Sequence, residues 1–132
     1  MAINPAFRDF VAELLAPLGP VGLRAMFGGA GIFYGGTMFG LLAQDTVYFK
    51  VGEGNRADFE AAGSDPFAYR GRNGREIALS YYALPEALLE DQDLLLDWAR
   101  KAVAAALEAA RREPLARRRP DGISRVRKGA PR

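Results

Sequence analysis

The sequence of 132 residues contains no cysteine and no histidine, and each absence excludes whole classes of chemistry. Without cysteine the chain has no disulfides, no thiolate nucleophile and no Cys-ligated zinc. Without histidine it lacks Ser-His and Cys-His catalytic pairs, the commonest metal ligand and the usual general base near neutral pH. Carboxylates, lysines and tyrosines remain, but their spacing indicates no site. We therefore expect no enzymatic activity, no bound metal and no cofactor.

Long apolar runs are missing as well. None approaches the roughly 18 residues that a membrane-spanning helix needs, and the N-terminus has no basic region followed by an apolar stretch. Hydrophobic residues make up 49% of the chain, which is ordinary for a globular domain and sufficient for a core without disulfides. These features predict a cytoplasmic protein with one folded domain.

A glycine-rich segment, RAMFGGAGIFYGGTMFG at residues 24–40, raises the question of a phosphate-binding loop. A dinucleotide fingerprint that starts at Gly29 would need its third glycine at position 34, where the sequence has tyrosine. A Walker-type loop needs serine or threonine after its lysine, and none of the three lysines is followed by either. The flanking runs are short and strand-like, and Gly35-Gly36 between them is typical of a hairpin turn. The segment therefore predicts turns of a sheet.

The hydrophobic pattern predicts the order helix, β-meander, helix, hairpin, helix. Asn4 and Pro5 supply an N-cap and a first-turn proline for a helix over about residues 5–16. Alternating or short apolar runs predict strands near residues 23–28, 31–35, 37–43 and 46–51. The Asn73-Gly74 pair between two alternating runs predicts a second hairpin.

Two further helices are expected. Asn55 is a candidate N-cap for a short helix that places Phe59 and Ala62 inward and stops at Gly63. Leu84-Pro85-Glu86 predicts a short helical turn, and a long helix should follow from about Asp91. The residues of this helix expected to face inward are Leu95 or Leu96, Ala99, Val103, Ala106 and Ala110. On its outer face we expect Asp97 to pair with Arg100 and Lys101, and Glu108 with Arg111 and Arg112.

Charge is divided unevenly along the chain. Residues 1–110 carry 9 Lys/Arg against 14 Asp/Glu, a net charge of −5, whereas residues 111–132 carry 9 against 2, a net charge of +7. The predicted boundary places a domain at residues 1–112 and a basic tail at residues 113–132, which is too polar to bury much surface and should be disordered. A basic segment suits contact with nucleic-acid phosphates, but it also suits a solubility tail or one that lies on the acidic domain. The candidate nucleic-acid-binding residues are Arg111, Arg112, Arg117, Arg118, Arg119, Arg125, Arg127 and Lys128.

A candidate surface patch follows from strand alternation. Arg24 and Met26 alternate with Leu23, Ala25 and Phe27, which should point inward, while Tyr48 and Lys50 lie on the outward side of their own strand. These four residues are therefore candidates for one shared face: Arg24, Met26, Tyr48 and Lys50. Such a face can be solvated or the floor under a helix, it can pair with a second copy, or it can stack bases. Ser80, Tyr81 and Tyr82 offer hydroxyl groups, but no spacing suggests a base for a serine nucleophile.

Several short sequence segments, in the same order along the chain, resemble the N-terminal domain of the TfoX/Sxy family over about residues 5–110. These strings are Met26-Phe27-Gly28-Gly29 with Gly31-Ile32-Phe33, Val47-Tyr48-Phe49-Lys50-Val51, Asn55-Arg56, Phe59-Glu60-Ala61-Ala62-Gly63, Pro66-Phe67-Ala68-Tyr69, Ser80-Tyr81-Tyr82, Leu84-Pro85-Glu86 and Trp98-Ala99-Arg100. The resemblance implies an α+β, two-layer domain of the secretion-chaperone-like kind, in which N-terminal, middle and long C-terminal helices pack on a sheet made of an antiparallel β-meander and a β-hairpin. It implies no established catalytic residue.

The same resemblance suggests a function. The founding members of this bacterial family regulate natural competence, acting on transcription together with the cyclic-AMP receptor protein. They carry a second, helical C-terminal domain, in whose place this sequence has the basic tail, so we expect a single-domain member. The leading hypothesis is a non-enzymatic regulator of transcription or competence, whose domain contacts a protein partner and whose tail contacts DNA. A homodimer through sheet or helix surfaces is compatible with so small a regulator.

Two alternatives remain open. One is a protein-interaction or chaperone-like module with no nucleic-acid role. The other is a small enzyme or ligand-binding protein that uses Lys50, Arg24 and nearby tyrosines.

Overall fold

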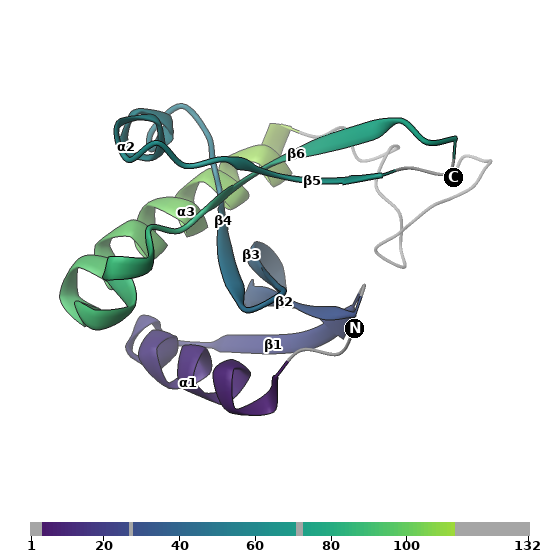
Figure 1. The fold of residues 1–132 in the computed structure, drawn as a ribbon. Coiled ribbons are helices and arrows are strands. Elements are labelled where there is room, and N and C mark those ends of the chain that lie inside the picture. The colour runs from purple at the N-terminus through teal and green to yellow at the C-terminus, as the bar shows by residue number, and fades with distance from the viewer. Residues whose placement is uncertain (1–3, 27, 71–72, 113–132) are drawn as a thin grey trace.

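The computed structural model describes residues 4–26, 28–70 and 73–112, which form one antiparallel sheet and three α-helices (Figure 1). The strands are β1 (Val21–Met26), β2 (Gly29–Tyr34), β3 (Thr37–Ala43), β4 (Thr46–Lys50), β5 (Pro66–Arg70) and β6 (Glu76–Ala83), in the sheet order β1-β2-β3-β4-β6-β5. The helices are α1 (Pro5–Leu15), α2 (Arg56–Ala61) and α3 (Gln92–Arg112), with 3₁₀ turns at Ala16–Leu18 and Glu86–Glu90. The predicted α+β class and element order are confirmed.

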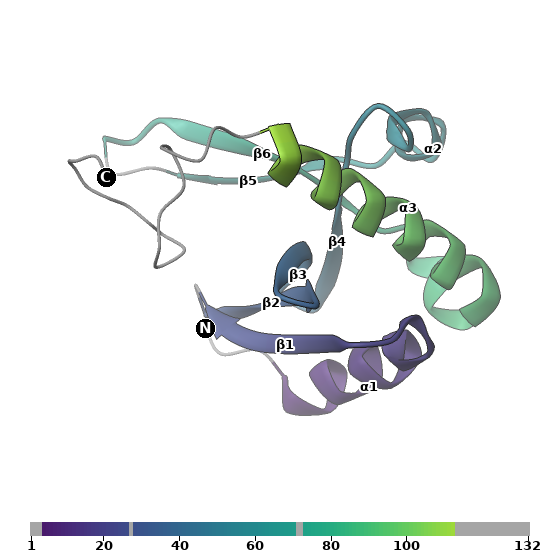
Figure 2. The ribbon, with the colours of Figure 1, turned by 180° about the vertical axis from the view of Figure 1, so that it is seen from behind.

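The sheet is strongly curved, and the helices lie on its convex side. In Figure 1 β1 and β2 form the lower arm, β5 and β6 the upper arm, and α3 passes behind β4 and the upper arm; in Figure 2 α3 lies in front of them. One core cluster contains side chains from all three helices and from the convex side of the sheet, including Val11, Phe59 and Ala99. The molecule therefore has two layers, and its concave sheet face is not covered by any of the helices in the described ranges.

The turns follow the local sequence as predicted. Asn4 accepts a hydrogen bond from the Ala6 amide at 2.8 Å and so caps α1. Gly35 and Gly36 connect β2 and β3 with φ of 55° and 97°, a left-handed conformation that glycine adopts without steric cost. Asn73 and Gly74 lie between the paired strands β5 and β6, which confirms the second hairpin.

Three other glycines of the segment at residues 24–40 lie inside strands. Gly29 and Gly31 belong to β2, and Gly40 belongs to β3. A Cβ atom at Gly40 would lie 2.8 Å from the Tyr48 carbonyl oxygen, and one at Gly29 would meet the Leu42 carbonyl oxygen, so neighbouring backbone excludes a side chain at these two positions; at Gly31 the nearest atoms belong to side chains. The turn prediction is therefore confirmed at Gly35 and Gly36, and the predicted strands at Gly31 and Gly40 are confirmed as well, but Gly29, predicted to lie between two strands, belongs to β2.

Aromatic rings and small residues fill the core. Phe59 of α2 is fully buried and packs edge-on against Trp98 of α3, with 4.7 Å between ring centroids. On α3 both Leu95 and Leu96 are buried, and the predicted inward residue Ala99 is buried as well. Two predicted inward residues are wrong, because Ala25 is exposed near the end of edge strand β1 and Ala62 is exposed beyond the last turn of α2.

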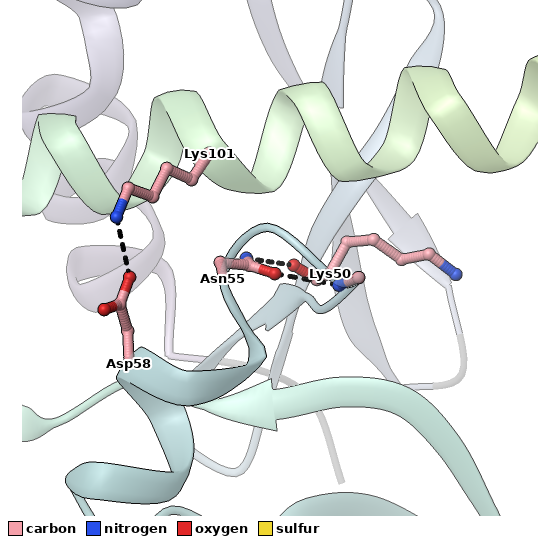
Figure 3. Close-up of polar contacts among 5 residues, drawn as sticks. Lys50, Asn55, Asp58 and Lys101 are labelled. Carbon is pink, nitrogen blue, oxygen red and sulfur yellow. Dashed lines mark hydrogen bonds and ion pairs between the residues drawn. The ribbon is translucent and has the colours of Figure 1, made fainter.

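The ion pairs of α3 agree with the prediction except at one residue. Asp97 pairs with Arg100 at 3.0 Å, and Glu108 pairs with both Arg111 and Arg112. Lys101, by contrast, reaches across to Asp58 of α2 at 2.9 Å (Figure 3). The predicted Asp97–Lys101 pair is therefore wrong, because the packing of α2 against α3 brings a second carboxylate within reach.

No helix in the described part of the chain contains a stretch that is both long enough and apolar enough to cross a membrane.

Candidate functional site

The concave side of the sheet carries a group of aromatic, methionine and cationic side chains, which we call the open sheet face. In the described residues its members are Arg24, Met26, Phe33, Met38, Leu41, Tyr48, Lys50, Phe67 and Tyr81. Leu41 lies at its centre and is only 4% exposed, although it is absent from the core cluster beneath the helices. Neighbouring side chains of the same face therefore shelter Leu41.

The strand register places the four predicted patch residues on this face. Arg24 pairs with Gly31, which pairs with Leu41, which in turn pairs with Tyr48, so one row of side chains crosses β1 to β4. Met26 and Lys50 lie two residues from Arg24 and Tyr48 along their strands, and they point the same way because side chains alternate with period two.

Gly31 lets three of these side chains come together. A Cβ atom at Gly31 would lie 2.9 Å from Phe33 Cε1 and 3.0 Å from the Sδ atoms of Met26 and Met38. The ring and the two thioethers therefore occupy the space above Gly31, and they form an apolar surface in the middle of β2. Methionine packs adaptably against rings, which suits a surface that contacts flat groups.

Two cations lie over aromatic rings on this surface. The Arg24 guanidinium is 4.3 Å from the centroid of Phe33, and Lys50 Nζ is 5.2 Å from the centroid of Tyr81. Both distances are within cation–π range. A third contact joins Tyr48 edge-on to Phe67, with 5.1 Å between centroids. The open sheet face therefore combines three aromatic contacts with two positive charges.

Tyr81 belongs to this face and is partly withdrawn from water. Its hydroxyl donates a hydrogen bond to the Met38 carbonyl at 3.4 Å, and burial raises the pKa of Tyr81 to about 12. The folded chain holds this proton more tightly than the unfolded chain, whose tyrosines titrate near pH 10.

Alkaline titration should show this shift. Because the native state binds the Tyr81 proton up to about pH 12, the free energy of unfolding should fall as pH rises from about 10 toward 12. In the variant Tyr81→Phe this part of the pH dependence should be absent. Ultraviolet absorbance at the phenolate band, followed with urea unfolding at each pH, measures both effects; an unchanged slope in Tyr81→Phe would contradict the prediction.

The structure also brings together a serine and a lysine that the sequence did not connect. Lys50 Nζ donates to Ser80 Oγ at 2.7 Å across the β4–β6 pairing. A Ser–Lys pair acts as nucleophile and base only where the lysine can give up its proton, which usually needs burial. This hydrogen bond is exposed to solvent, so the arrangement supports a positional role for Ser80. No local sequence pattern predicts this contact, because residues 50 and 80 meet only through the pairing of β4 with β6.

Asn55 lies on the convex side and fixes the loop that follows β4. It is 2% exposed, its Oδ1 accepts from the Gly52 amide at 2.8 Å, and its Nδ2 donates to the Lys50 carbonyl at 3.0 Å (Figure 3). The residue does precede α2, but its side chain makes no capping bond to that helix. The predicted capping role is therefore wrong: Asn55 bridges the loop and the end of β4.

Two grooves border α3. The first, of about 330 Å³, lies between the loop at residues 52–54 and the helix, beside Lys101 and Arg112. The second, of about 280 Å³, is lined by Leu18, Tyr34, Arg100, Val103 and Leu107. Leu107 is 42% exposed there and is one of the exposed large hydrophobic residues of the described chain. The second groove is therefore an apolar feature on the helical side of the molecule.

The structure describes two of the eight basic residues predicted to contact nucleic acid. Arg111 and Arg112 are exposed in the last turn of α3, where cations complement the negative end of the helix, and both pair with Glu108. The predicted tail at residues 113–132 lies outside the described residues. It includes the other six candidates: Arg117, Arg118, Arg119, Arg125, Arg127 and Lys128. In the described ranges, acidic side chains do not gather in a group of three that could hold a metal ion.

The fold defines a two-layer α+β domain with its helices on one face of an antiparallel sheet. The family model of the TfoX N-terminal domain matches residues 13–106, which include part of α1, all six strands, α2 and most of α3. The chain therefore belongs to the TfoX N-terminal domain family, as its sequence strings predicted. A search of the curated proteins finds no match.

Proposed function

We propose that this protein is a non-enzymatic regulator in the bacterial cytoplasm, whose folded domain contacts a protein partner and whose basic tail contacts DNA. Membership in the TfoX N-terminal domain family supports a regulatory or competence-related role. The proposal rests mainly on the uneven distribution of charge: residues 1–110 have a net charge of −5 and residues 111–132 have a net charge of +7. A polyanion is attracted to the second part and repelled by most of the first.

The positions of the charges support this division. The basic character starts in the last turn of α3, at Arg111 and Arg112, and continues along the tail sequence. The acidic residues of the domain belong mainly to helices, turns and loops, since β1 to β5 contain no aspartate or glutamate. Its helical side is therefore the more acidic one, and it suits a protein partner better than DNA.

A specific feature of that side favours a protein partner. The groove lined by Leu18, Tyr34, Val103 and Leu107 exposes apolar atoms next to the charged side chain of Arg100. Apolar centres with polar rims are common at protein interfaces. The same groove also supports the second candidate function, a protein-interaction or chaperone-like module without a nucleic-acid role.

DNA binding separates the two candidates. Fluorescence anisotropy with a mixed-sequence duplex should show binding by the full chain that weakens steeply as salt is added. The slope of the logarithm of the binding constant against the logarithm of the salt concentration should be about −0.9 for each phosphate neutralised. A variant with glutamine at Arg117, Arg118, Arg119, Arg125, Arg127 and Lys128 should lose most of this binding. A control with glutamine at Arg56, Arg75 and Arg100, exposed arginines of the domain, should keep it. Absence of binding by the full chain at physiological salt would favour the interaction module.

A further inference from the structure

We propose that the open sheet face binds single-stranded nucleic acid, with bases stacked on its rings and phosphates placed at Arg24 and Lys50. This inference goes beyond the proposed tail contact, because it assigns a second site in the folded domain and a different form of nucleic acid. It does not require that the tail binds DNA.

The charge of the face selects an anionic occupant. Arg24 and Lys50 are its charged members, and both are positive. The strands β1 to β5 contain no aspartate or glutamate, although the domain as a whole has a net charge of −5. A positive sheet face in an acidic domain therefore concentrates anions at one place.

The rings of the face select flat, apolar groups. Phe33 of β2, Tyr48 of β4 and Tyr81 of β6 lie on the same side of the sheet; β3 separates the first two, which are therefore about two strand separations of roughly 4.8 Å apart across the sheet, whereas β4 and β6 are neighbours. Met26 and Met38 lie beside the Phe33 ring above Gly31. Aromatic side chains on a sheet, with cations beside them, are the arrangement on which single-stranded nucleic acids stack their bases. A duplex hides its bases and cannot use these rings.

Other occupants fit the face less well. The tail at residues 113–132 carries seven Lys/Arg against two Asp/Glu, so Arg24 and Lys50 would repel it. A second copy that used this same face in a two-fold dimer would set these cations against their own counterparts. An acidic polypeptide would satisfy the charges but would bring fewer flat groups to the rings. Single-stranded nucleic acid supplies both the charges and the flat groups.

The test measures anisotropy of a fluorescein-labelled oligothymidylate of about twelve nucleotides, within the usual range of site sizes. The proteins are the full chain, the double variant Arg24→Gln/Phe33→Leu, and the matched double variant Phe10→Leu/Arg100→Gln, which makes the same chemical changes at exposed positions on the helical side. We expect about tenfold weaker binding in the first variant and no change in the second. Phe33→Tyr, which keeps a ring, should bind like the parent chain.

Three further arms make the result specific. Arg24→Gln alone changes an exposed side chain, so it should fold normally and lower the single-strand salt slope by about 0.7. The variant with glutamine at the six basic tail residues should lose duplex binding. In that background, adding Arg24→Gln/Phe33→Leu should still weaken the binding of oligothymidylate. Unlabelled oligothymidylate should compete, which shows that the dye itself is not the ligand.

Several outcomes would overturn the inference. Equal binding by Arg24→Gln/Phe33→Leu and the parent chain would assign all single-strand binding to the tail. Equal affinity for an abasic strand of the same length would show that bases do not stack on the face. Competition by polyglutamate as effective as by oligothymidylate would indicate an acidic polypeptide as the occupant.

Discussion

The substitution Gly29→Ala is expected to destabilise the protein by about 4 kcal/mol or more, which places it among the most damaging single changes in the chain. A Cβ atom at this position would lie 2.0 Å from the Leu42 carbonyl oxygen and 3.2 Å from its carbon. Both atoms belong to the backbone of β3, so they cannot rotate away as a side chain would. Either β2 and β3 separate locally and lose hydrogen bonds, or the sheet shifts.

The measurement is thermal and urea unfolding followed by the fluorescence of Trp98, the single tryptophan of the chain, which is packed against Phe59. The midpoint temperature of Gly29→Ala should fall by roughly 15 °C. Gly22→Ala is the matched control, because it lies in the neighbouring strand and a Cβ atom there has no heavy atom within 4 Å. It should change stability by no more than about 0.5 kcal/mol. Equal stability of the two variants would mean that the start of β2 is not tightly packed on β3.

The glycines of the segment at residues 24–40 show which features of the fold can be predicted from the sequence and which cannot. The pair Gly35-Gly36 was predictable, because adjacent glycines between two apolar runs have a known local geometry. The crowding at Gly29 and Gly40 was not, because the backbone atoms that exclude a side chain there come from other strands. The sequence separated turn from phosphate loop correctly, but it contained no sign of close backbone packing inside β2 and β3.

The open sheet face was predictable in part for a similar reason. Period-two alternation places Arg24 with Met26, and Tyr48 with Lys50, on one side of each strand. The remaining members depend on the strand order, since β6 pairs with β4 and so brings Tyr81 beside Lys50. A bulge between β2 and β3 also places Phe33 opposite Met38, a register that no local pattern fixes.

Helix-surface rules failed where tertiary packing offered a second partner. The i,i+3 rule correctly paired Asp97 with Arg100, because both side chains point to solvent on one helix. Lys101 pairs with Asp58 of α2 instead, since it faces a neighbouring helix. Both side chains remain substantially exposed, so the pair contributes little stability and mainly marks the contact between α2 and α3.

Asn55→Asp is the second substitution with a large expected effect, and it separates two roles for the same residue. An aspartate is as good an N-cap as asparagine, so a capping role predicts little change or a small gain in stability. In the structure, however, the side chain is buried and its Nδ2 donates to the Lys50 carbonyl. A carboxylate in the same place would set a negatively charged oxygen against that carbonyl. We therefore expect a loss of about 3 kcal/mol or more at pH 7, measured by urea unfolding.

The pH dependence of this loss distinguishes electrostatics from a packing defect. Burial should raise the pKa of the introduced carboxyl above about 3.9, its value in an unfolded chain, so the native state takes up a proton first as pH falls. The protonated carboxyl can donate to the Lys50 carbonyl as the amide did, and part of the lost stability, relative to the parent chain, should return toward pH 4. Asn4→Asp, at a helix start where Oδ1 accepts the Ala6 amide, should show little change at either pH. A neutral effect of Asn55→Asp at pH 7 would restore the capping interpretation, whereas a loss that is the same at every pH would mean that shape rather than hydrogen bonding fixes this loop.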